Sequence, residues 1–219
     1  MESNRLEAFS DGVFAVAITL LALDLAIGGP GRHQPMLAAK LADHWPAFFA
    51  YAVSFATIGI IWVNHHTLCG NFSEIDRTLL FINLLLLFFV VCIPFATSTI
   101  AAYLRAGSGQ ASQAAVIYQG VMEGMSISFT LLFWWAIRRK HLRVALTPDQ
   151  ARRARIRFGI GQAGYIVGIG IAFASPVASL ALSGLVAIYY IFEQTPVRPQ
   201  SPPDQGTPTT EETPGPTGD

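Results

Sequence analysis

Residues 78–103 read TLLFINLLLLFFVVCIPFATSTIAAY, a run that contains no charged side chain. A bilayer core is about 30 Å thick, so a helix needs about 20 mostly apolar residues to cross it. The run has that length, and a helix satisfies its own backbone N–H and C=O groups, which would be costly to leave unpaired in lipid. We therefore predict a membrane-spanning helix here, with Pro94 as a point where it bends.

Five further segments have the length and composition of spanning helices. The GGPG sequence at 28–31 ends the first, because proline cannot continue the helical hydrogen bonds. The tryptophan pair at 134–135 and the RRK sequence at 138–140 mark a membrane exit, and Pro176 divides the last two segments. The six predicted spans cover residues 9–27, 47–66, 78–103, 114–137, 158–174 and 177–192. The predicted fold class is therefore all-α, a polytopic membrane protein with six transmembrane helices.

The composition agrees with a lipid environment. Of the 219 residues 13% are charged, whereas a soluble domain carries about 25%. A net charge of +0, with Lys and Arg concentrated in one stretch, argues against a nucleic-acid surface, so we expect no nucleic-acid partner. The two cysteines, Cys69 and Cys92, are interpreted as packing residues and not as a disulfide framework.

The composition changes abruptly after Glu193, to Pro, Thr, Gly, Gln and acidic residues. Such a segment cannot bury enough apolar area to offset the entropy of ordering it. The sequence therefore predicts two regions, a six-helix transmembrane domain over 1–194 and a disordered Pro/Thr-rich acidic tail over 195–219.

The basic residues indicate which side of the membrane each helix end faces. If the N-terminus is cytoplasmic, the only Lys or Arg residues left outside are Arg32, Lys40 and Arg105. The positive-inside rule therefore favours both termini in the cytoplasm. The most basic stretch follows the fourth span, and within it Thr147 and Pro148 offer an N-cap and a first helical residue, so a short helix is expected in this loop.

The start of the first span carries polar side chains within RLEAFSDGVF at 5–14. An unpaired Asp near the bilayer centre costs about 3 kcal/mol, so Asp11 needs a partner or water. Alternatively, Ser10 and Asp11 cap the first helical turn, where the helix dipole favours negative charge. Asp11 points about 140° away from Val16 and should face neighbouring helices. One side of this helix collects Phe9, Gly12, Val16, Thr19, Leu20, Leu23 and Ile27. Taken alone, such a stripe is more often a helix-packing face than the lining of a pore.

The pattern RxxxFSD, carried by Arg5, Phe9, Ser10 and Asp11 and followed by GVFAVAITLL, resembles the first-helix signature of the bacterial branch of the transmembrane protein 175 family. Members of that family are potassium channels. The likeness is dense over 5–25, and the six-span layout agrees with it. The resemblance implies a homotetramer in the bacterial inner membrane, with four first helices lining a central pore, K⁺ as the permeant ion and no cofactor.

The resemblance also assigns the pore constriction to Val16, five residues after the motif aspartate, and to Leu20 and Leu23 one and two turns later. Thr19 matches a position where some members present a hydroxyl. The resemblance also implies that the pore has no re-entrant selectivity-filter loop. The sequence agrees, because it contains no TVGYG run to supply the carbonyl ligands of such a filter. At the first constriction position the family often has Ile or Leu. Val16 is one methylene smaller, so we expect a slightly wider constriction.

A second polar group lies at the end of the second span, in WVNHH at 62–66. Interfacial anchoring by tryptophan explains it without any function. The resemblance implies instead that these side chains join the first helix in a polar network that holds the pore helix. The network predicted in this way comprises Arg5, Phe9, Ser10, Asp11, Trp62, Asn64, His65 and His66. We expect no metal site at His65 and His66, because adjacent residues project about 100° apart on a helix.

Glu123 places a carboxylate inside the fourth span, between Gly120 and Gly124. Intramembrane carboxylates serve in proton relays, but a structural partner such as Gln119 or a hydroxyl of another helix is equally compatible, and the sequence leaves both open. Gly164 and a second glycine four residues later, in the fifth span, indicate close helix packing.

The leading functional prediction is passive, potassium-preferring cation conduction. The alternative is a proton-coupled secondary transporter that uses Asp11, Glu123 and a histidine. An enzyme is not expected, because the sequence offers no nucleophile and base, or metal cluster, at usable spacing.

Overall fold

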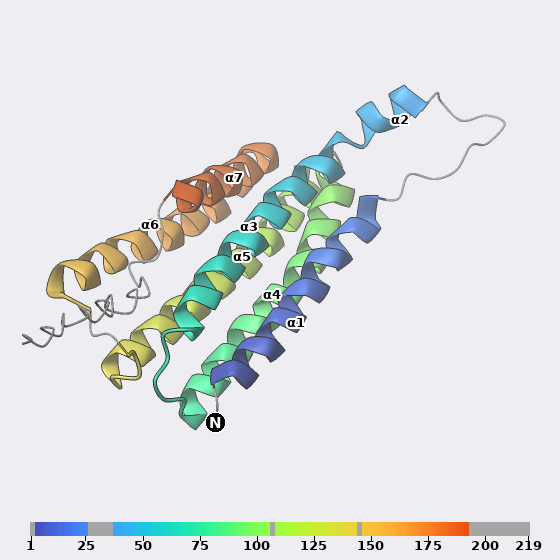
Figure 1. The fold of residues 1–219 in the computed structure, drawn as a ribbon. Coiled ribbons are helices and arrows are strands. Elements are labelled where there is room, and N and C mark those ends of the chain that lie inside the picture. Colours follow the sequence, from blue (N-terminus) through green and yellow to red (C-terminus); the bar gives the residue numbers. More distant parts are fainter. Residues whose placement is uncertain (1–2, 26–36, 106–107, 144–145, 193–219) are drawn as a thin grey trace, which may run out of the picture.

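The apolar runs of the sequence fold into long α-helices joined by short segments (Figure 1). The computed structural model describes residues 3–25, 37–105, 108–143 and 146–192. In these ranges the helices are α1 (Ser3–Leu21), the 3₁₀ helix η1 (Ala22–Leu25), α2 (Leu37–Asp43), α3 (Trp45–Cys69), α4 (Arg77–Tyr103), α5 (Ser108–Arg138), α6 (Pro148–Ala172) and α7 (Pro176–Phe192). The predicted all-α class is confirmed, and the six long helices correspond to the six predicted spans.

Three of these helices are long and apolar enough to cross a bilayer by themselves. They comprise Trp45–Cys69, Arg77–Tyr103 and Gly109–Arg138. The apolar part of α7, Pro176–Ile191, is shorter. Both α1 and α6 begin with polar turns, so only their later turns are suited to lipid.

The helices pack so that α1 is an outer helix. It contacts α3 and α4, whereas the α6–α7 hairpin contacts α5 and α3. Figure 1 shows α1 and this hairpin on opposite sides of the central helices α3, α4 and α5. The core between the helices contains large buried side chains such as Phe14, Leu86, Ile93, Tyr118 and Phe133. One face of α1 is therefore fixed to the bundle, and the other is uncovered in the protomer.

The first helix begins six residues before its predicted start at 9, and its α-helical part ends at Leu21. Leu23 therefore belongs to η1 and not to α1, while Ile27 lies outside the described residues. Because Ser10 and Asp11 now lie in the interior of α1, the alternative that they cap its first turn is wrong. Arg5 and Glu7 form its polar first turns instead, which a hydropathy criterion cannot assign to a span.

The fifth predicted span and the short helix predicted before it are one helix, α6. The predicted start is right, because Thr147 is the N-cap and Pro148 the first helical residue. The Thr147 Oγ1 accepts a hydrogen bond from the Gln150 N–H at 3.3 Å, and Gln150 Oε1 accepts one from the Thr147 N–H at 2.8 Å. This capping box begins a helix whose arginine-rich first half extends beyond the apolar segment.

The connections α3–α4 and α5–α6 meet at one end of the bundle. The Ser73 N–H donates to the His141 carbonyl at 2.7 Å, and the Arg143 N–H donates to the Asn71 carbonyl at 2.9 Å. Asp76, the N-cap of α4, accepts hydrogen bonds from the Leu79 N–H and the Trp135 indole. The N-terminus of α1 lies at this same end (Figure 1).

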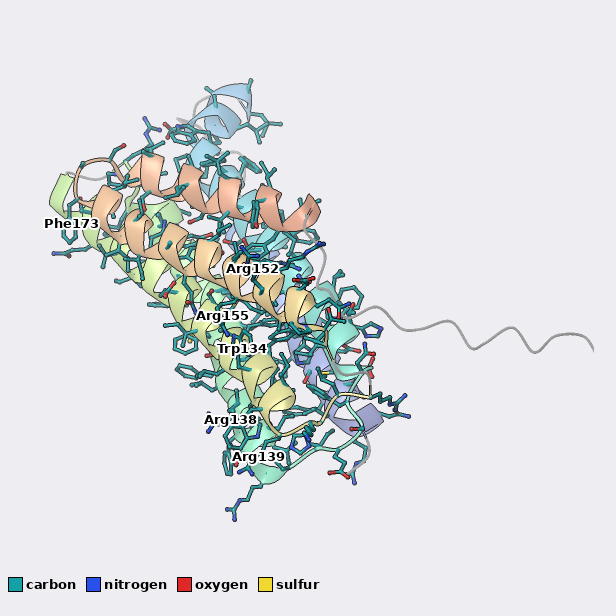
Figure 2. The ribbon with its side chains drawn as sticks, turned by 90° about the vertical axis from the view of Figure 1, so that its left-hand side faces the viewer. Trp134, Arg138, Arg139, Arg152, Arg155 and Phe173 are labelled. Atoms are coloured by element: carbon teal, nitrogen blue, oxygen red, sulfur yellow. The ribbon has the colours of Figure 1, made fainter. Side chains whose placement is uncertain are left out.

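Basic side chains gather on the α5–α6 side of that end, and Figure 2 shows Arg138, Arg139, Arg152 and Arg155 with Trp134. The Arg155 guanidinium lies 5.5 Å from the Trp134 ring centroid. The Arg139 guanidinium lies 4.8 Å from that of Trp135. Tryptophan is enriched at both membrane interfaces, so these residues are suited to an interface with water.

Cys69 and Cys92 are both free, in agreement with the sequence. The predicted tail over 195–219 lies outside the described residues.

Candidate functional site

The uncovered face of α1 carries the predicted stripe. Val16 is 56% exposed in the protomer, and Leu23 is 69% exposed. Phe9, Gly12, Thr19 and Leu20 are also exposed. The opposite face buries Leu6, Ser10, Phe14, Ala17 and Leu21 against the bundle. The described part of this stripe is therefore an apolar surface with no charged side chain, presented by α1 and, at Leu23, by the 3₁₀ helix η1 that continues it.

Thr19 adds one hydroxyl to that surface. Its Oγ1 donates a hydrogen bond to the Val16 carbonyl at 2.9 Å, three residues earlier on the same helix. The hydroxyl proton is therefore directed at the backbone. A threonine oxygen has two lone pairs as well as its proton, so Thr19 presents an acceptor toward the exposed side.

The buried face is fixed by a chain of hydrogen bonds through three helices. Asn83 of α4 donates through Nδ2 to Ser10 Oγ of α1 at 3.1 Å, and Ser10 Oγ donates to the Leu6 carbonyl at 2.9 Å. Asn83 Oδ1 accepts from Nε2 of His65 of α3 at 2.7 Å. Ser10, His65 and Asn83 are all buried. A satisfied polar group in this position holds α1 in one register against α3 and α4.

Next to this chain lie two contacts that are more exposed. The Trp62 indole Nε1–H donates to Asp11 Oδ1 at 2.9 Å. His66 Nδ1 lies 2.8 Å from Glu7 Oε1. The predicted packing of Asp11 toward a neighbouring helix is thus confirmed, and its partner comes from the WVNHH segment.

The structure brings five of the predicted network residues together, namely Ser10, Asp11, Trp62, His65 and His66. It places Asn64 elsewhere. Its Oδ1 accepts a hydrogen bond from Arg157 Nη2 at 3.1 Å, which joins α3 to α6. Arg5 and Phe9 are exposed on α1, and within the described part of the chain neither makes a hydrogen bond, ion pair or ring contact with the other predicted residues.

Three residues of the site were not predicted from the sequence. Asn83 is the only polar residue between Leu79 and Cys92, and an amide inside a spanning run is a signal of function or pairing. Cys69 lies four residues after His65, on the same face, with its Sγ 3.6 Å from His65 Nδ1. Glu7 had no signal beyond its position one turn before Asp11.

Glu123 and Gln119 do not pair with each other, although both lie on α5. Gln119 instead donates through Nε2 to the Ser179 carbonyl at 2.8 Å and accepts from Ser183 Oγ at 3.1 Å, which fixes α5 to α7. Glu123 is half-buried, and its Oε2 makes no hydrogen bond to any described residue. The alternative in which Gln119 is the structural partner of Glu123 is therefore wrong.

The predicted close packing at the glycines of the fifth span is confirmed. A Cβ on Gly168 would lie 2.7 Å from the Gln119 side-chain amide, and one on Gly164 would lie 2.7 Å from Val186. Gly124 of α5 similarly leaves room for Phe89, whereas a Cβ on Gly120 would meet nothing within 4 Å. Gly164 and Gly168 therefore let α6 approach α7 and α5 closely, and Gly124 lets α5 approach α4.

Known proteins resemble this chain in sequence and in fold. Residues 5–94, which include α1, α3 and most of α4, match the family model described as endosomal/lysosomal potassium channel TMEM175. A potassium channel of Streptomyces collinus is 46% identical over 90% of this chain and 95% of its own length. A potassium channel of Chamaesiphon minutus is 36% identical over 86% of this chain and 93% of its own length.

The fold agrees with a solved structure. The crystal structure of a lysosomal potassium-selective channel TMEM175 homolog from Chamaesiphon minutus has a TM-score of 0.76 and 33% identity. The alignment of the two structures covers 87% of this chain and 97% of the solved channel chain. The likeness therefore extends over nearly the whole described bundle, including α5, α6 and α7.

Proposed function

This chain belongs to the TMEM175 family of channels, and we propose that it conducts potassium ions passively across a bacterial inner membrane as a homotetramer. It is a multi-pass membrane protein of a channel family, not an enzyme. Two bacterial relatives named as potassium channels, similar over almost their full lengths, support potassium as the permeant ion.

The proposed pore is supported above all by the exposure of one face of the first helix. The uncharged face of α1 with Val16, Thr19, Leu20 and Leu23 is uncovered in the protomer, while the opposite face is held by buried hydrogen bonds. A single helix cannot enclose an ion path. Several copies of α1, meeting around a shared axis with these faces inward, can do so, and the family likeness supports four.

The proposed constriction consists of aliphatic rings. Val16 and Leu23 are seven residues apart, which is about 11–12 Å along the chain axis, because α1 gives way to the 3₁₀ helix η1 after Leu21. Rings of this kind close a pore by excluding water over a short length, and rotation of the side chains lets water and ions enter. Thr19 lies between the rings with an oxygen acceptor that can replace part of the hydration of a cation.

The proposed orientation has both termini in the cytoplasm. The start of α1, the α3–α4 connection and the α5–α6 connection lie at one end of the bundle. The same end carries Arg155 of α6 and Arg139, which directly follows α5, stacked on Trp134 and Trp135. Both findings support the positive-inside assignment.

Replacement of Val16 by Asn tests the pore assignment in planar bilayers. A polar ring should wet the constriction, raise the single-channel conductance and shift the reversal potential under K⁺/Na⁺ gradients toward weaker discrimination. Val91→Asn is the matched control, because Val91 is 47% exposed but lies on α4. Unchanged conductance and reversal potential in Val16→Asn, or equal changes in both variants, would refute a pore lined by α1.

The same recordings separate a channel from the proton-coupled carrier. Ohmic single-channel steps support the proposal, whereas saturable uptake without steps favours the carrier. The mass of the protein in detergent tests the subunit number, and a monomer or dimer that retains conduction would contradict the tetramer.

A further inference from the structure

Three side chains that can bind metal ions converge behind the proposed pore face. Glu7 and Asp11 are four residues apart and lie on the same side of α1. His66, in the last turns of α3, faces both. One ligand atom from each of the three lies within 4.8 Å of the other two, and Glu7 Oε1 is 2.8 Å from His66 Nδ1.

The chemistry of this set favours a transition-metal ion over Mg²⁺ or Ca²⁺. Mg²⁺ and Ca²⁺ are bound almost entirely by oxygen, whereas an imidazole suits Zn²⁺ and similar ions. Zn²⁺ binds imidazole nitrogen and carboxylate oxygen at about 2.0–2.2 Å. Tetrahedral ligands at that distance are about 3.5 Å apart, so rotation of the carboxylates is enough to close the set around an ion.

The surroundings of the three ligands fit an open site. Trp62 donates to Asp11 Oδ1 at 2.9 Å, which orients the carboxylate and leaves Oδ2 for an ion. The His66 side chain is 53% exposed, and that of Glu7 is 21% exposed. An ion can therefore reach the site from outside, and water can complete its coordination.

We propose that Glu7, Asp11 and His66 bind a divalent transition-metal ion, with Zn²⁺ as the best probe, and that the ion bridges α1 and α3. The site lies outside the proposed ion path, because Glu7 is nine residues from Val16 and projects to the opposite side of α1. A bound ion replaces the direct contact between Glu7 and His66 and joins the two helices more firmly. The pair His65 and His66 alone indicates no metal site, because all of its ligands would come from the second span. The two carboxylates of the proposed site come from the first span.

Titration of the purified full-length protein with Zn²⁺ and Co²⁺ tests this site. We expect one saturable Zn²⁺ site per protomer by calorimetry, and a Co²⁺ absorption spectrum characteristic of nitrogen and oxygen ligands. Glu7→Gln and His66→Gln should each weaken binding at least about tenfold. The inference does not rest on the proposed conduction, because binding is measured in detergent without any ion gradient.

Two further variants separate loss of a ligand from damage to the fold. Glu7→His exchanges a carboxylate for an imidazole and should retain binding. His44→Gln removes an exposed histidine that bonds only locally, at 2.8 Å to the Lys40 carbonyl, and should leave the Zn²⁺ affinity unchanged. The proposal is overturned if the wild type shows no saturable binding, if Glu7→Gln and His66→Gln bind as tightly as the wild type, or if Glu7→His binds as weakly as Glu7→Gln.

Discussion

Asn83 of α4 donates a hydrogen bond to Ser10 of α1 at 3.1 Å, within the buried part of the bundle. The same amide accepts from His65 of α3, so one side chain joins three helices. The position of the proposed pore helix therefore depends on a residue that is not on it.

Replacement of Asn83 by Leu should lower the free energy of unfolding by about 1–2 kcal/mol, because the buried His65 N–H then loses its amide acceptor and keeps only the weak acceptor Cys69 Sγ at 3.5 Å. Thermal unfolding in detergent measures the change. Thr99→Val on the same helix is the control, since Thr99 is half-buried and its hydroxyl bonds only to the Phe95 carbonyl of the same helix. Equal stability of Asn83→Leu and the wild type would show that the chain of hydrogen bonds does not hold α1.

Trp62→Phe removes the indole donor to Asp11 and keeps an aromatic ring in place. We expect a loss of about 1 kcal/mol, at the low end for a bond to a charged group because Trp62 is partly exposed. Loss of this hydrogen bond between α3 and α1 should also alter the open probability in bilayer recordings. Trp45→Phe, at the other end of α3, should alter neither quantity; identical results for the two variants would contradict a specific role for the bond between Trp62 and Asp11.

Asp76 should make the stability of the protein depend on pH in acid. Desolvation opposes its charged form, but hydrogen bonds from the Leu79 N–H, His141 and Trp135 outweigh this and hold the pKa of Asp76 below its ordinary value. A lowered pKa in the folded state stabilises the protein above the pKa of the unfolded state, about 3.9, and this stabilisation is lost as the pH falls through the folded-state pKa.

Two variants of Asp76 test this dependence. Asp76→Ala also removes the N-cap of α4 and should cost about 1 kcal/mol at pH 7. Asp76→Asn keeps a capping oxygen but carries no charge, so its difference from the wild type should shrink as the pH falls from 5 to 3. The midpoints of thermal unfolding at several pH values measure both effects. A difference between Asp76→Asn and the wild type that stays constant over this range would contradict the lowered pKa.

Gly168→Ala should separate α6 from α5. The added Cβ would lie 2.7 Å from the Gln119 amide and would displace it from Ser179 and Ser183. We expect a loss of about 1–3 kcal/mol. Gly170→Ala is the matched control on the same helix, because its Cβ meets nothing within 4 Å and alanine favours a helix. If both variants were equally stable, the contact between Gly168 and Gln119 would not be tight.

The sequence predicted helices better than it predicted their partners. Apolar runs located α3, α4, α5 and α7 to within a few residues, except that α5 begins six residues before its predicted start. Hydropathy failed at the starts of α1 and α6, since helices that leave the membrane carry polar turns there.

Which polar side chains pair between helices could be determined only from the packed structure. The stripe on α1 followed from a period of 3.6 residues, a local property of one helix. The bond between Asn64 and Arg157 joins residues 93 positions apart, and no local pattern indicates which of the polar side chains at 62–66 faces α1 and which faces α6. The family likeness predicted a network at the right helices but assigned Asn64, Arg5 and Phe9 to it as well.

The direction of the Thr19 hydroxyl has a consequence for the sign of the permeant charge. Because its proton is given to the Val16 carbonyl, four copies arranged around an axis would present the negative ends of four dipoles to the centre. Such a ring repels chloride and attracts cations without a single acidic side chain in the stripe. Exclusion of anions would then follow from the backbone geometry of one helical turn.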